Sequence, residues 1–232
     1  MSGHTVQDNI VAVRGRLESA LQKAGRTPGS ASLLAVSKKK PAEDVQAAYE
    51  AGQRSFGENY LQEALDKQQA LSMLDITWHF IGAVQSNKTR EIAEHFDWCH
   101  TVDRLKTARR LSEQRPDHLP PLNVCLQVNI SRQESKSGAA PEEVETLAAE
   151  IATLPGLSFR GLMAIPAPTV SFNEQRLPFR ALRELLDTLR INHPDQPLDT
   201  LSMGMSDDID AAITEGSTLV RVGTAIFGAR AS

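Results

Sequence analysis

The chain has 232 residues, and its 25 Lys and Arg against 29 Asp and Glu give a formal net charge of −4 at pH 7. Without a basic surplus, this charge argues against nucleic acid as the main partner and favours a small-molecule ligand. With 41% hydrophobic and 23% charged residues, the composition is that of a globular protein and excludes the disordered and fibrous classes.

The amino-terminal segment predicts a helix over 6–24. Charged side chains interrupt its apolar residues, so the segment has neither the apolar core of a secretory signal nor the run of about 20 apolar residues that a membrane span needs. We therefore expect a cytoplasmic protein. Cys99 and Cys125 each lie in an apolar run, and we expect buried free thiols there rather than a disulfide.

Short apolar or β-branched runs alternate with helical patterns along the rest of the chain. The predicted strands are 33–38, 54–59, 78–83, 98–103, 123–129, 159–166, 200–206 and 219–227.

The segments between these runs show helix boundaries. Pro41 opens one helix and Gly52 closes it, while Pro141 opens another that ends before Pro155. Further N-caps are expected at Asn87 and at Asp207–Asp208.

Eight alternating strand and helix units predict an α/β fold, a closed (β/α)₈ TIM barrel. Almost nothing follows the eighth strand, so the helix over 6–24 is expected to cover the barrel where a last helix would lie. An open doubly wound sheet is the competing architecture. The glycine-rich dinucleotide turn expected after its first strand is absent, because SKKKP occupies 37–41.

The first strand ends in lysine at the face where barrels carry their active sites. Lys38 follows four apolar residues, and Lys39 and Lys40 add like charge beside it. Crowding of positive charge and partial desolvation disfavour an ammonium form, which would make the amine available for a Schiff base with an aldehyde or ketone. Alternation puts Lys38 and Lys40 on the same side, so the pattern alone does not choose between them, and a solvated basic loop is the alternative.

The seventh and eighth strands supply a candidate phosphate site. Ser206 follows one strand, and Gly223 and Thr224 end the other. The loops after these strands commonly bind phosphate in barrels, where glycine admits backbone N–H groups and hydroxyls add donors. The alternative is a helix cap at Ser206 and a packing glycine at Gly223. Acidic Asp207 and Asp208 would oppose an anion unless they point away.

Arg221 stands inside the apolar run of the eighth strand. A buried guanidinium needs a partner, so Arg221 either pairs with a carboxylate or offers its donors to a ligand; a solvated, outward arginine is the alternative.

Three other features are weaker candidates. We expect His79 to be a hydrogen-bonded core histidine rather than a catalytic one. His95, Cys99 and His100 are close in sequence, but a strand and a loop would not direct them at one metal ion. A solvated surface is expected for the basic helix face formed by Arg104, Lys106, Arg109 and Arg110 with Lys88 and Arg90 nearby.

Together these motifs resemble the YggS/PROSC family, the pyridoxal 5′-phosphate (PLP) homeostasis proteins, over essentially the full length. The resemblance rests on LAVSKKKP over 34–41, FGENY over 56–60, WHFIGAVQSNK over 78–88, and SMGMSDD over 202–208 with GSTLVRVGTAIFG over 216–228. The family pattern has a variable residue between the two lysines that here is Lys39. The resemblance implies one domain over 1–232, similar to the amino-terminal barrel of alanine racemase and of eukaryotic ornithine decarboxylase.

The resemblance also implies a role for each matching residue. Lys38 would hold the cofactor PLP as a Schiff base, and Arg221 would face the pyridine nitrogen and keep it unprotonated, which weakens the electron sink that carbanion chemistry uses. The remaining implied contacts are phosphate binding by Ser206, Gly223 and Thr224, and ring contacts by Asn59 and Met203.

The resemblance implies a binding protein in PLP homeostasis that influences amino-acid and keto-acid balance, with no established catalysis. The racemases place a second base, a tyrosine of an added domain, opposite the lysine. This chain has only Tyr49 and Tyr60, neither of them beyond the barrel, so we expect no efficient racemisation. Two alternatives stay open: a weak PLP-dependent racemase, decarboxylase or transaminase for a small amino acid, and a cofactor-free Schiff-base aldolase. Partners are expected to be PLP and apo-enzymes that need it, with no metal, nucleic acid or membrane, and a monomer is expected.

Overall fold

Eight parallel strands close into a barrel in the computed structural model, which describes residues 3–134 and 136–229. Each strand pairs with the next, and β8 pairs with β1 through the register Leu34 to Arg221. The strands are β1 (Ser32–Val36), β2 (Ser55–Glu58), β3 (Thr77–Phe80), β4 (Trp98–Val102), β5 (Leu122–Gln127), β6 (Leu157–Met163), β7 (Thr200–Ser202) and β8 (Leu219–Val222). The predicted (β/α)₈ barrel is confirmed, and the open doubly wound sheet is wrong because the β1–β8 pairing leaves no free edge.

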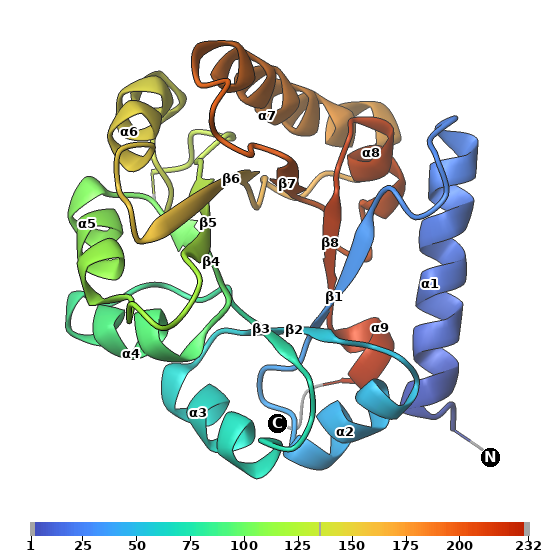
Figure 1. Cartoon of the computed structure of the whole chain (residues 1–232). Helices are drawn as coiled ribbons and strands as arrows, with labels where there is room; N and C mark the ends of the chain where they lie inside the picture. The colour runs from blue at the N-terminus through green and yellow to red at the C-terminus, as the bar shows by residue number, and fades with distance from the viewer. Residues whose placement is uncertain (1–2, 135, 230–232) are drawn as a thin grey trace.

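Helices form a ring outside the strands (Figure 1). They are α1 (Val6–Lys23), α2 (Ala42–Glu50), α3 (Leu61–Ala70), α4 (Thr89–His95), α5 (Leu105–Gln114), α6 (Val144–Ile151), α7 (Phe172–Asn192), α8 (Ile209–Thr214) and α9 (Thr224–Phe227), with 3₁₀ turns at η1 (Ser86–Lys88) and η2 (Pro141–Glu143). None of the helices in the described part of the chain is long and apolar enough to cross a membrane.

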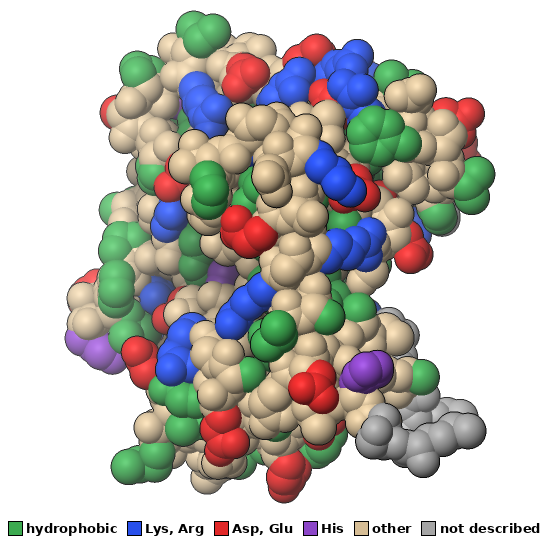
Figure 2. Space-filling model, turned by 90° about the vertical axis from the view of Figure 1, so that its right-hand side faces the viewer, with side chains coloured by type: hydrophobic (Ala, Val, Ile, Leu, Met, Phe, Trp, Pro, Cys, Tyr) green, Lys and Arg blue, Asp and Glu red, His purple; other side chains and the backbone are tan. Residues whose placement is uncertain are grey.

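Helix α1 covers the barrel beside β8, as expected, because it packs against both α8 and α9 (Figure 1). The helix begins at a capping box: the Thr5 hydroxyl accepts from the Asp8 N–H, and the Asp8 carboxylate accepts from the Thr5 N–H. Ile10, Leu17 and Leu21 lie on one buried face. On the side of the molecule that carries α1, basic and acidic side chains are interspersed (Figure 2).

Several element boundaries differ from those predicted. The run 219–227 is not one strand: β8 ends at Val222, and the N–H groups of Ile226 and Phe227 bond to the Gly223 carbonyl to form the short helix α9. Strands β1 and β7 end before Lys38 and Ser206, so both residues lie in the loops after the strands. Asn87 is inside η1 and does not cap a helix, because α4 begins only at Thr89.

Close packing inside the barrel requires glycine at position 57. Gly57 of β2 faces Leu34 and Ile81, and a Cβ added there would lie 2.9 Å from Ile81 Cδ1 and 3.0 Å from Leu34 Cδ2. Cys99 and Cys125 are buried free thiols, as expected, and burial raises the pKa of the Cys99 thiol to about 11.

Candidate functional site

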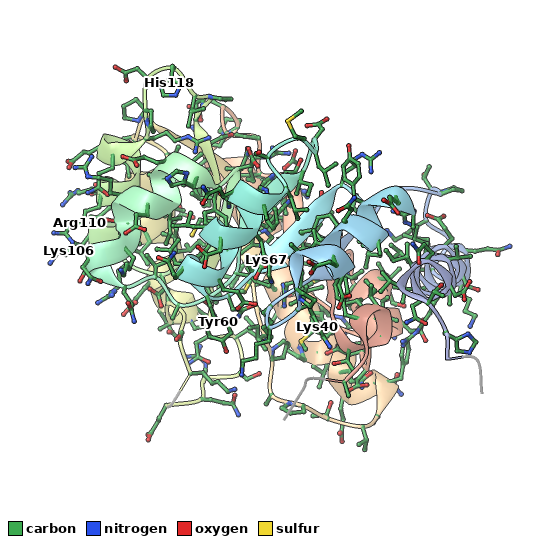
Figure 3. The ribbon with its side chains drawn as sticks, turned by 90° about the horizontal axis from the view of Figure 1, so that it is seen from below. Lys40, Tyr60, Lys67, Lys106, Arg110 and His118 are labelled. Atoms are coloured by element: carbon green, nitrogen blue, oxygen red, sulfur yellow. The ribbon has the colours of Figure 1, made fainter. Side chains whose placement is uncertain are left out.

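A cavity of about 580 Å³ opens at the carboxyl ends of the strands, within the size range of small-molecule sites. Lys40 and Tyr60 lie toward one end of the barrel and His118 at the other in Figure 3. The cavity is lined by Val36, Lys38, Lys40, Asn59, Ile81, Met163, Ile165, Met205, Ser206, Asp207, Arg221, Gly223, Thr224 and Gly228. Residues far apart in sequence meet here because parallel strands bring their carboxyl ends to one face.

Lys38 lines this cavity from the loop that follows β1. Lys40 lines it as well, and its Nζ donates to the Ala229 carbonyl at 2.8 Å. Lys39 has a left-handed backbone with φ 60°, and its Nζ lies 5.7 Å from the centre of the Tyr60 ring. The loop therefore turns the middle lysine away from the two that face the cavity.

Hydrogen bonds clamp the backbone on both sides of Lys38. On one side, the Ser37 hydroxyl donates to Glu58 Oε1 at 2.8 Å, and Lys67 Nζ donates to the Ser37 carbonyl at 2.7 Å. On the other, the Lys39 N–H donates to Glu63 Oε1 at 2.6 Å. These contacts fix the position of the loop that carries Lys38.

Lys67 and Glu58 form the buried centre of this clamp. Their Nζ and Oε1 atoms are 2.7 Å apart, with Glu63 at 3.0 Å from the same ammonium group. Burial raises the pKa of Glu58, although the neighbouring Lys67 lowers it. The sequence analysis did not single out Lys67. Its position on the inward face of the helix after FGENY is the only sign in the sequence, and helical spacing alone does not distinguish it from a lysine on the surface.

Arg221 is buried in the barrel wall, with 5% of its surface exposed. Its Nη1 donates to Ser202 Oγ at 2.7 Å, and its Nη2 donates to the Ala164 carbonyl at 3.0 Å. Burial lowers the pKa of the guanidinium to about 10, so it is charged at neutral pH. The solvated, outward arginine is thus wrong. Both of these bonds are made to neutral groups, and the guanidinium keeps further N–H donors for the cavity.

The predicted phosphate residues Ser206, Gly223 and Thr224 lie together on the cavity wall. A Cβ on Gly223 would lie 3.2 Å from the Val36 carbonyl oxygen, so a larger residue would press on β1. Asp208 is not among the cavity-lining residues, and its Oδ1 accepts from the Met205 N–H at 2.7 Å. Asp207, in contrast, lines the cavity.

Asn59 also lines the cavity, and its Oδ1 is a buried acceptor with no hydrogen-bond partner. An orphan of this kind in a cavity wall is accounted for by a ligand donor or water. Met203 is not brought to the cavity: it is fully buried in the hydrophobic core, and Met205 lines the wall instead. Sequence reasoning did not single out Met205, Ile81 or Ile165.

The weaker candidates lie elsewhere. His79 is a hydrogen-bonded core histidine, as predicted, with its Nδ1 2.8 Å from His100 Nε2. His95 ends α4 with its side chain half-exposed, so it does not meet Cys99 and His100. No group of three or more potential metal ligands occurs in the described ranges.

Comparison with known proteins places this geometry in a family. The family model "Alanine racemase, N-terminal domain" matches residues 10–231. Proteins named pyridoxal phosphate homeostasis protein are 61% identical to the chain in Pseudomonas aeruginosa, over 97% of this chain and 96% of that protein, and 53% identical in Escherichia coli, over 97% of each.

Solved structures agree with this comparison. The structure of PipY from Synechococcus elongatus with PLP bound is 37% identical in sequence and has a TM-score of 0.85. The match includes 97% of this chain and 100% of the PipY chain. An alanine racemase from Corynebacterium glutamicum, 17% identical with a TM-score of 0.67, shares the fold over 61% of its own length and 95% of this chain. The chain therefore belongs to the family of the alanine racemase amino-terminal domain, and within it to the pyridoxal phosphate homeostasis proteins.

Proposed function

We propose that this protein binds PLP in the cavity at the carboxyl end of the barrel and takes part in PLP homeostasis, thereby influencing amino-acid and keto-acid balance. The observation that carries the proposal is the convergence of Lys38, Arg221, Ser206, Gly223 and Thr224 on one cavity. The relatives named for PLP homeostasis and the PLP-bound PipY structure support the same ligand.

The residues present fit PLP in three respects. Asn59 Oδ1 is an acceptor in the wall without a hydrogen-bond partner, and Arg221 offers a charged donor group to the same cavity. Ser206 and Thr224 present hydroxyl groups, and Gly223 its backbone, on one part of the cavity wall, a set of groups suited to an anion. Met163, Ile165 and Met205 add an apolar wall suited to an aromatic ring.

Bound PLP would supply an aldehyde and an electron-withdrawing ring. Lys38 would condense with that aldehyde: its nitrogen forms a C=N bond, and the carbonyl oxygen leaves as one water molecule. Ser206, Gly223 and Thr224 would bind the phosphate, and Asn59 and Arg221 would hold the ring. Met203 would contribute only by packing behind the cavity wall, since its side chain is buried.

Binding without turnover is the role that the arrangement favours. Arg221 is a permanent cation where the resemblance puts the pyridine nitrogen, and a cation there opposes the ring protonation that stabilises carbanions. Tyr49, one of two tyrosines in the chain, accepts from the Asp75 N–H and stacks on Arg54, away from the cavity lining. Tyr60 is half-exposed and is not among the cavity-lining residues.

Three experiments test the proposal and its alternatives. PLP-loaded protein is mixed with an apo-transaminase, with and without a trap for free aldehyde; we expect transaminase activity to appear, and no transfer in either arm would contradict a role in PLP supply. The loaded protein is also incubated with single amino acids in D₂O, and steady deuterium exchange at Cα would establish the alternative, a weak racemase, decarboxylase or transaminase. A yellow protein that loses colour with borohydride would exclude the cofactor-free aldolase.

We further propose that the protein does this in the cytoplasm as a monomer and that its macromolecular partners are apo-enzymes that require PLP. The monomer is argued from the chain's match to the barrel alone, since the alanine racemases are matched over little more than half of their length. Light scattering of the eluting protein tests it, as described in the Discussion.

A further inference from the structure

A line of hydrogen bonds crosses the barrel interior beneath the cavity and ends at Arg221. From Arg221 it passes to Ser202 Oγ at 2.7 Å, from Ser202 Oγ to His100 Nδ1 at 2.8 Å, and from His100 Nε2 to His79 Nδ1 at 2.8 Å. The four residues come from β8, β7, β4 and β3 and are all buried. The line therefore connects Arg221 to the opposite wall of the barrel.

Both histidines are neutral at physiological pH. Burial lowers the pKa of His79 to about 3, and burial together with nearby His79 and Arg221 lowers the pKa of His100 well below its ordinary value. Each ring then carries one N–H and one acceptor nitrogen, so the line has only two possible directions.

The donor at the Arg221 end decides between the two directions. A guanidinium has no acceptor, so Arg221 donates to Ser202 Oγ. If His100 Nδ1–H also donated to that oxygen, neither Arg221 nor His100 could accept the Ser202 hydrogen, and a second N–H dipole would point its positive end at the cation. In the other direction, Ser202 donates to His100 Nδ1, and His100 Nε2–H donates to His79 Nδ1. Every hydroxyl and N–H between Arg221 and His79 Nδ1 then has an acceptor, and the acceptor atom of each group lies on the side toward the cation.

We propose that Ser202, His100 and His79 form a one-way hydrogen-bond chain that positions Arg221 for the cofactor, with both histidines protonated on Nε2. Ser202 donates its own proton to His100, which leaves its oxygen to accept from Arg221 Nη1. The Ala164 carbonyl accepts from Nη2, the other terminal guanidinium nitrogen. The guanidinium is thus held at Nη1 and Nη2 from inside the barrel, while the residue lines the cavity. The inference deepens the proposed function, since it assigns three positioning residues to the group placed opposite the pyridine ring.

The first test needs no cofactor, and it is read on the wild-type protein, with variants used only to assign the signals. In cofactor-free protein labelled with ¹⁵N-histidine, long-range ¹H–¹⁵N correlation spectra report which ring nitrogen carries the proton. We expect a pyrrole-type Nε2 and a pyridine-type Nδ1 for both His79 and His100, assigned by loss of their signals in His79→Gln and His100→Gln. A proton on Nδ1 of His100, or an imidazolium at neutral pH, would overturn the proposal.

The second test reads the guanidinium itself. In the cofactor-free wild type we expect separate Nη1 and Nη2 resonances for Arg221, because bonds to Ser202 and Ala164 hinder rotation about Nε–Cζ. Ser202→Ala should merge them, Ser202→Thr should restore them, and Ser158→Ala, a half-buried serine on β6 outside the chain of bonds, should leave them separate. Merged resonances in the wild type, or no change in Ser202→Ala, would contradict the proposal.

Affinity for PLP links the chain of bonds to function. Ser202→Ala should weaken PLP binding about three- to tenfold, as expected for one hydrogen bond, and Ser202→Thr should recover most of the loss. Unchanged affinity in Ser202→Ala would overturn the positioning role. Failure of the wild type to bind PLP would refute the proposed function instead, and the tautomer and guanidinium measurements on cofactor-free protein would stand apart from that result.

Discussion

The proposed covalent bond to PLP depends on one residue, Lys38. It lies in a loop and lines the cavity rather than filling the core, so Lys38→Ala should remove the covalent PLP adduct while changing the free energy of unfolding by no more than about 0.5 kcal/mol. Absorbance of the loaded protein and its denaturant midpoint measure the two effects. The matched variant is Lys40→Ala, since Lys40 lines the same cavity; a visible band that persists in Lys38→Ala and disappears in Lys40→Ala would move the site to Lys40.

Asp207 places a negative charge on the wall that is proposed to bind phosphate. Because a carboxylate repels the phosphate, Asp207→Asn should strengthen PLP binding about two- to fivefold at low ionic strength, and the gain should shrink as salt screens the charge. Titration of PLP into each variant measures this. Asp210→Asn, an exposed acid of α8 that does not line the cavity, is the control. Weaker binding in Asp207→Asn would show that the carboxylate contributes to the site.

The individual site residues were predictable to different degrees. Lys38 and Gly223 could be found because each follows an apolar run, where a barrel carries its site, and Arg221 because a charged residue inside such a run needs a partner. Ser202 and His100 could not, because their partnership joins strands 102 residues apart in the sequence. Met203 and Met205 illustrate the same limit: alternation along an expected strand fails once β7 has ended at Ser202.

Helix α3 is fastened to β1 and β2 through Lys67, which bonds to Ser37 and pairs with buried Glu58. Lys67→Met would leave the Glu58 carboxylate buried without its cation, and it should lower the free energy of unfolding by about 3–5 kcal/mol. Denaturant unfolding measures this loss. Lys106→Met on the exposed face of α5 is the control, with an expected change of at most about 0.5 kcal/mol; an equally small change in Lys67→Met would show that the ion pair contributes little.

The same variant has an expected pH dependence. The pKa of Glu58 is raised by burial, so the folded state binds that proton more tightly than the unfolded state does, and stability falls as pH rises above about 4.3. Without Lys67, which lowers this pKa, the fall should be steeper and should extend to higher pH. Adding Glu58→Gln to Lys67→Met should remove the extra slope. Equal slopes in the single and double variants would contradict the assignment to Glu58.

For helices and strands, the spacing of apolar residues and the residues that break an element predicted which elements form better than where each one ends. The helix over 6–24 was predictable from its apolar spacing and agrees with α1 within one residue. The turn of the chain into α9 was not, because apolar residues continue on both sides of Gly223 and give no sign that its carbonyl would accept the bonds of a helix. Strand ends in the barrel depend on partner registers, and these are properties of neighbouring strands rather than of local sequence.

Closure of the barrel gives the whole molecule its functional layout. Pairing of β1 with β8 brings the loop of Lys38 beside Gly223 and Thr224, so the two ends of the chain form one site. The eight alternating units made this closure predictable, whereas the depth of the cavity and its lining required the packed side chains.

The oligomeric state is a further prediction for the whole molecule. The chain matches the barrel part of the alanine racemases and should elute as a monomer of 25.4 kDa, with or without PLP. Size-exclusion chromatography with light scattering measures the mass at several protein concentrations. A mass of twice this value that persists on dilution would contradict the monomer.

The proposed binding of PLP depends on one lysine amine at the barrel mouth. Borohydride reduction of PLP-loaded protein, followed by proteolysis and mass spectrometry of the peptides, identifies that amine. We expect one pyridoxyl adduct per chain, on Lys38. An adduct on Lys40, adducts scattered over surface lysines, or no adduct at all would contradict it.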